Sequence, residues 1–159
     1  MKKEEFLDSI LEVAYDDAIN LREDYTEAIF SAIKSKKVEG NKELDELIHE
    51  SNNLPEINPP SVRWIDIEHK TENIRHAILI ILNHEFKKLL LDVKDKLKVN
   101  AREEIEMMYF PDEDEETPFT DNEIEKLFNV FFEDAQDLAL DEYIRENIEL
   151  NNMSIDYFG

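Results

Sequence analysis

The apolar positions of the chain follow a helical pattern, which is longest between residues 70 and 98. They recur there at intervals of three and four residues, the spacing of one face of an α-helix, in a run without Gly or Pro. Lys87, Lys94 and Lys98 fall on the outer surface of its second half. We predict one helix over 70–98, against which the other helices pack. Its apolar face comprises Ile74, Ala77, Ile78, Ile81, Leu82, Phe86, Leu89, Leu90, Val93 and Leu97.

Shorter helical runs precede this segment. One is predicted over residues 3–21, and a second run over 25–33 is either continuous with it or kinked near residues 22–24. Gly40 is suited to end this part of the chain as a helix, and Asn41 is suited to cap a short helix that follows.

Two more helices are predicted after residue 98. The first begins near Asn100 and runs to Phe110, where Pro111 stops it. The second begins at Thr120, which forms a capping box with Glu123, a reciprocal pair of hydrogen bonds in the first turn of a helix.

The rest of the chain contains few turn residues. Gly 2 and Pro 5 provide little of the turn chemistry that a β-sandwich or a dinucleotide-binding fold needs. Prolines mark residues 51–61 as an irregular connector, and residues 62–67, around Trp64, are compatible with either a short extended segment or the lead-in to the long helix. We therefore predict a single all-α domain over residues 1–159, with five to six helices packed around 70–98.

Charge is the strongest compositional signal. The formal net charge is −22, and it is unevenly distributed. Residues 103–159 contain 19 acidic residues against Lys126 and Arg145, a net charge of −17, whereas residues 1–102 contain 21 acidic and 16 basic residues, a net charge of −5. With 42% hydrophobic residues and nine Phe, the chain is not a disordered acidic tail. A folded domain of this kind repels nucleic acid and anionic membranes and attracts cationic surfaces.

The sequence contains no motif of a known catalytic site. Glu72 and His76 are spaced to pair on one helix, but no nucleophile elbow, Gly-rich phosphate loop or His-Glu-x-x-His motif is present. The chain has no cysteine, so disulfides and thiolate metal ligands are excluded. It also shows neither an apolar signal core nor a membrane-spanning stretch. We expect a cytoplasmic protein that is not an enzyme and needs no cofactor.

Two weak metal patterns are present. Glu46 and His49 form one Glu-x-x-His pair of the type used in di-iron bundles, but residues 66–69 hold the nearest second unit and further carboxylates are needed. Residues 112–123 match the ligand spacing of an EF-hand calcium loop, although Thr117 replaces the glycine that this loop requires. Calcium binding is therefore an alternative function, and no metal site is assigned. The matching residues are Asp112, Asp114, Glu116, Thr120 and Glu123.

The candidate binding surface is acidic. An unbroken acidic run lies between the last two predicted helices, and further acids recur along the final helix opposite its apolar face. A local excess of 17 negative charges exceeds what solubility needs and destabilises the fold through self-repulsion, so we expect a function that uses it. The predicted acidic binding residues are Asp112, Glu113, Asp114, Glu115, Glu116, Glu133, Asp134, Asp137, Asp141 and Glu142.

Two segments resemble inhibitors of nucleic-acid enzymes. Residues 132–148, FEDAQDLALDEYIRENI, resemble the acidic C-terminal helix of Ocr-type phage antirestriction proteins, which are helical DNA mimics. Residues 109–118, YFPDEDEETP, are similar to the Tyr-Tyr-Pro-acidic loop of nuclease-colicin immunity proteins. That likeness implies that Tyr109 and Phe110 are the aromatic pair that contacts the toxin. Phage anti-CRISPR proteins share the size and the acidity of this chain.

These observations favour a non-catalytic inhibitor of a nuclease or a similar DNA-acting enzyme, in phage anti-defence or toxin immunity. Its acids would steer association with a cationic surface, and Tyr109, Phe110 and Tyr143 are candidate anchors. The expected partner is a basic nucleic-acid-binding protein, not nucleic acid or a membrane. The alternative is a helical interaction or assembly-chaperone module, with a homodimer as one form, in which the charge serves only solubility.

Overall fold

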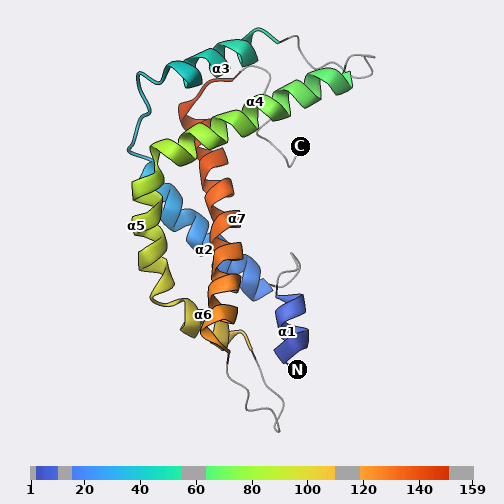
Figure 1. The fold of residues 1–159 in the computed structure, drawn as a ribbon, viewed down its shortest axis with the longest axis vertical. Helices are drawn as coiled ribbons and strands as arrows, with labels where there is room; N and C mark the ends of the chain where they lie inside the picture. Colours follow the sequence, from blue (N-terminus) through green and yellow to red (C-terminus); the bar gives the residue numbers. More distant parts are fainter. Residues whose placement is uncertain (1–2, 11–15, 55–63, 110–118, 151–159) are drawn as a thin grey trace.

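Every element in the described part of the chain is a helix. The computed structural model describes residues 3–10, 16–54, 64–109 and 119–150, which contain seven helices. The prediction of an all-α fold is confirmed, and the described residues contain more helices than the five to six predicted. In chain order (Figure 1), the helices are α1 (Lys3–Ser9), α2 (Asp16–Ile33), α3 (Lys42–Asn52), α4 (Trp64–Glu85), α5 (Lys87–Lys98), α6 (Ala101–Met107) and α7 (Asp121–Asn147).

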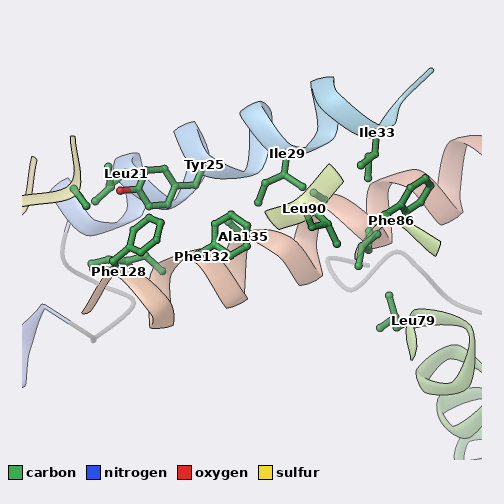
Figure 2. Close-up of a cluster of buried hydrophobic side chains, with 14 of the residues drawn as sticks. Leu21, Tyr25, Ile29, Ile33, Leu79, Phe86, Leu90, Phe128, Phe132 and Ala135 are labelled. Carbon is green, nitrogen blue, oxygen red and sulfur yellow. The ribbon is translucent and has the colours of Figure 1, made fainter. Parts of the chain in front are cut away.

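The centre of the molecule is the pair of helices α2 and α7, not the segment 70–98. The two helices lie side by side and run in the same direction (Figure 2). The Tyr25 ring meets the Phe128 ring edge-on, with 5.6 Å between the ring centroids. Burial of one large apolar side chain contributes about 1.5–3 kcal/mol, so this seam is a major source of stability. The seam includes the buried residues Leu21, Tyr25, Ile29 and Ile33 of α2 and Phe128, Phe132 and Ala135 of α7.

The predicted long helix is two helices that meet at a sharp bend (Figure 1). Phe86 lies between α4 and α5 with φ −97° and ψ 8°, outside helical geometry. Its side chain is only 4% exposed, and its ring packs edge-on against Tyr143 of α7 at 5.1 Å. The structure therefore corrects the prediction of a single helix. Burial of Phe86 against α7 prevails over the helical propensity of a run without Gly or Pro.

Helix α3 begins where the sequence predicts it. The Asn41 side chain accepts a hydrogen bond from the Leu44 N–H at 2.9 Å, and its Nδ2 donates to Glu85 Oε1 at 2.8 Å. One residue therefore caps α3 and also ties it to the end of α4. Gly40, just before it, has φ +71°, a left-handed conformation that glycine adopts without strain.

The start of α7 also follows the prediction. The Glu123 N–H donates to Thr120 Oγ1 at 3.2 Å, and the Thr120 N–H donates to Glu123 Oε1 at 2.9 Å. Both hydrogen bonds of the capping box are thus formed, which satisfies two N–H groups that a helix start otherwise leaves unpaired.

Two choices that the sequence leaves open are decided, and two boundaries differ from the predictions. The predicted helix 3–21 corresponds to α1 and the start of α2, and α2 continues through residues 22–24, as in the continuous alternative. Trp64 is the first residue of α4, so residues 64–67 are the lead-in to that helix and not an extended segment. Helix α6 ends at Met107, before the predicted end at Phe110, which lies outside the described residues. None of the described helices is both long and apolar enough to cross a membrane.

Candidate functional site

The described part of the predicted acidic surface lies on α7. Glu133, Asp134 and Asp137 of this helix are exposed. This placement follows from the helical repeat, because the neighbouring apolar residues Phe132 and Ala135 face the core. Of the three carboxylates, Asp134 has a cation near it, with Arg22 Nη1 3.9 Å from its Oδ2. We refer to Glu133, Asp134 and Asp137 as the acidic stripe.

Burial and neighbouring charges both act on the carboxylate of Asp137. Partial burial raises the pKa of Asp137, and the negative charge of Asp141 raises it further. Arg75 opposes this change, whereas Asp134 and Glu133 add to it. The ionised form of Asp137 is therefore disfavoured in the folded chain. A cation brought to this position by a partner would relieve the repulsion.

Asp141 is not part of the exposed surface on which the sequence places it. It is 8% exposed, and Arg75 Nη2 of α4 donates to both of its carboxylate oxygens, at 2.7 and 2.6 Å. Burial raises the pKa of Asp141, and the hydrogen bonds from Arg75 act against that change. This carboxylate therefore holds α7 against α4, and Arg75 already occupies the place of an external cation.

Tyr143 and Glu142 lie next to Asp141 in the sequence, and both already have partners within the chain. The Tyr143 hydroxyl donates to the Lys36 carbonyl at 2.8 Å, and its ring is buried against Phe86. Tyr143 is thus a core residue, which corrects its prediction as an anchor for a partner. Glu142 is half-buried and lies 3.6 Å from Arg145 Nη1 on the next turn.

Tyr109 is half-buried in an aromatic cluster that attaches α1 to the rest of the chain. Its ring lies 5.0 Å from the Phe6 ring and 5.2 Å from the Phe119 ring, and Phe6 and Phe119 are 5.6 Å apart. A contact of Tyr109 with a partner would therefore use only the exposed part of a ring that already stabilises the fold. The other predicted loop residues lie outside the described ranges: Phe110, Asp112, Glu113, Asp114, Glu115 and Glu116.

The residue that would complete the calcium loop is engaged elsewhere. The Glu123 carboxylate accepts the Thr120 N–H and forms an ion pair with Lys3 Nζ at 2.8 Å. The hydrogen bond from Lys3 lowers the pKa of Glu123 most, and the Thr120 N–H lowers it further. Helix α1 and the capping box thus both use Oε1 of Glu123, one of the two oxygens that an EF-hand assigns to its bidentate ligand.

The histidines form no cluster of ligands. All four are exposed, and the Nε2 atom of His49 lies 3.0 Å from the side-chain nitrogen Nδ2 of Asn53, the residue that follows the end of the same helix. Within the described ranges, no group of three or more His, Asp or Glu side chains is arranged to hold a metal ion. The described residues therefore provide an anionic surface and not a coordination site.

Sequence reasoning missed how α5 borders the acidic stripe. Two of the lysines predicted on the outer surface are directed toward α7: Lys98 Nζ lies 3.3 Å from Glu125, and Lys94 Nζ lies 5.6 Å from the centre of the Phe132 ring. The spacing of Lys87, Lys94 and Lys98 places them on one face of a helix, which is the only local signal. Which helix they face is decided by the bend at Phe86.

Fold and surface together define a class: an all-α, strongly acidic protein with an exposed anionic stripe on its central helix and a basic helix beside it. The sequence matches no protein-family model, and neither a curated protein nor a solved structure is significantly similar to it.

Proposed function

We propose that this chain is a non-catalytic inhibitor that binds the cationic nucleic-acid-binding surface of a nuclease or a similar DNA-acting enzyme. The observation that supports this function most is the separation of charge, with a net charge of −17 after residue 102. Exposed acids on α7 supply part of this surface, and the acidic residues 112–116 extend it in sequence. Phage anti-defence or toxin immunity is the setting that fits such an inhibitor.

The burial of the candidate residues refines which side chains would meet the target. Glu133, Asp134 and Asp137 are exposed and lie within two turns of one rigid helix, so they present a fixed spacing of charge. Asp141 and Tyr143 contribute indirectly, by holding α7 against α4 and the end of α2. The pKa of Asp137, which is raised first by burial and then by the charge of Asp141, supports the same function, because a cationic partner stabilises that carboxylate in its ionised form.

The test is the affinity for three candidate targets: an RNA-guided nuclease, a restriction enzyme and a colicin-type DNase. We expect one of them to bind and the dissociation constant to rise at least about tenfold between 50 and 300 mM NaCl, since screening weakens attraction between exposed charges. Duplex DNA should compete with the protein for the target. Binding that ignores both salt and DNA would contradict the charge-based mechanism.

A matched pair of triple variants locates the surface. We expect Glu133→Gln/Asp134→Asn/Asp137→Asn to weaken target binding about tenfold or more, a loss of about 1.4 kcal/mol. The control, Glu43→Gln/Glu46→Gln/Glu50→Gln, removes the same charge from exposed positions on α3. Equal losses in both variants would mean that net charge matters and the acidic stripe does not.

The second candidate function is a helical protein-interaction module. Two large apolar side chains, Leu91 and Ile80, are 51% and 58% exposed. They lie close to a groove between α5 and α7, and they favour a contact that depends on apolar area as well as on charge.

A further inference from the structure

Helices α4, α5 and α7 border a groove of about 250 Å³ on the surface. Its floor is apolar and is formed by Leu90 of α5 and Phe132 of α7. Leu90 and Phe132 are among the core residues that Figure 2 labels. A hydrogen bond between Gln136 of α7 and Asn83 of α4 ties these helices together beside the groove. The groove is thus built on packed helices.

Exposed apolar side chains extend the floor of this groove outward. Leu91 lines it and is 51% exposed. Ile80 is 58% exposed and precedes the groove residue Asn83 by three positions, which places it on the same side of α4. A single exposed apolar residue is ordinary on a protein surface, but two beside one apolar hollow mark an interaction surface.

The two walls of the groove have opposite charge. Lys87 and Lys94 of α5 form one wall, and Glu133 of α7 forms the other, with Asp137 one turn further along α7. Among the described residues, Lys87 and Glu133 form no ion pair with one another or with a third residue. Each wall therefore presents charge that a partner of opposite sign can neutralise.

We propose that this groove is the interface of a homodimer with a two-fold axis parallel to the groove. Rotation about such an axis places the lysine wall of each protomer on the acidic wall of its partner, and it brings the exposed side chains of Leu91 and Ile80 of both protomers into the interface. An axis across the groove would instead place lysine on lysine and acid on acid. A two-fold interface must be complementary to itself, and a groove with one basic and one acidic wall meets this condition in the first arrangement only.

The dimer can be tested without a target, and it shares Glu133 with the acidic stripe of the proposed inhibitor function, so a target bound to the stripe should compete with dimerisation. Its affinity is expected to be modest, because the groove is small and each protomer has a formal net charge of −22. Sedimentation velocity of the full chain from 1 to 500 µM in 150 mM NaCl tests it. We expect the weight-average mass to rise from monomer toward dimer across this range. A monomer at every concentration would overturn the proposal.

Substitutions of exposed apolar residues test the location. Leu91→Glu and Ile80→Glu should each shift the midpoint of dimerisation at least tenfold upward in concentration. The controls are Val99→Glu and Met107→Glu, which change residues that are 79% and 72% exposed and lie outside the residues that line the groove. All four changes are at exposed positions, so circular dichroism should show the same helix content. Dimerisation of Leu91→Glu at the wild-type concentration would overturn the proposal.

A mixing experiment tests the two-fold arrangement itself. Lys87→Glu alone places acid on acid at both copies of the contact, and Glu133→Lys alone places lysine on lysine, so each variant should remain monomeric. A mixture of the two variants restores opposite charges at both contacts of a heterodimer. We expect the mixture to associate at least tenfold more tightly than either variant alone. A mixture that associates no better than its components would contradict the arrangement.

Discussion

At the scale of single residues, burial divides the acids of α7 into two kinds. Asp141 lies beneath α4 and accepts two hydrogen bonds from Arg75, whereas Glu133 and Asp134 face solvent. Both kinds of acid recur at the spacing of one helix, so the helical pattern of the sequence alone does not separate the buried acid from the exposed ones. Removing Asp141 or its partner should therefore impair folding, and removing the exposed acids should weaken binding while the fold stays intact.

The ion pair of Arg75 provides the test at this scale. Arg75→Ala leaves the Asp141 carboxylate in a site that is 8% exposed without its hydrogen-bonding partner. Loss of one member of a buried pair is expected to lower the free energy of unfolding by about 3 kcal/mol, measured by urea denaturation. Arg145→Ala, at a more exposed pair with Glu142, should cost below about 1 kcal/mol. Equal costs would show that the Arg75 pair is no more important than a surface pair.

At the scale of helices, local signals set where helices begin, and distant contacts set where they bend. The caps at Asn41 and Thr120 could be predicted, because each uses hydrogen bonds between residues three positions apart. The bend at Phe86 could not, since it depends on the ring of Tyr143 in another helix. The same holds for Asp141, whose partner Arg75 is 66 positions away. The all-α class and the helix starts could thus be predicted from the sequence, but the central pairing of α2 with α7 could not.

The capping box of α7 provides the test at this scale. Thr120→Ala removes the hydroxyl that accepts the Glu123 N–H, and we expect a loss of about 1 kcal/mol in the free energy of unfolding. Thr120→Ser keeps the hydroxyl and should stay within about 0.5 kcal/mol of the wild type, because Ser is an equally good cap. Thermal and urea unfolding measure both variants. A loss shared by Ser and Ala would point to the methyl group of Thr120 instead.

At the scale of the whole molecule, repulsion among like charges opposes folding. The formal net charge is −22, and the acidic stripe on α7 is part of the excess of acids that follows residue 102. Exposed ion pairs such as Lys98 with Glu125 offset little of this repulsion. Stability should therefore depend on ionic strength in the direction set by repulsion and not by ion pairs.

Raising NaCl from 20 to 500 mM tests this balance. The distance over which charges interact falls below about 5 Å at the higher concentration, so we expect the melting temperature of the wild type to increase. The Glu133→Gln/Asp134→Asn/Asp137→Asn variant carries less repulsion and should gain less from the same addition of salt. A melting temperature that falls with salt would mean that specific ion pairs stabilise the chain more than its net charge destabilises it.

The pairing of α2 with α7 also determines when the protein can fold in a cell. Tyr25 of α2 packs on Phe128 of α7, which lies far along the chain. A ribosome therefore releases α2 well before it has synthesised α7, and the apolar side of α2 has to wait for its partner. Contacts between distant parts of a sequence form slowly and leave apolar surface uncovered in the meantime. A nascent chain of this protein therefore exposes the apolar side of α2 until synthesis has passed α7.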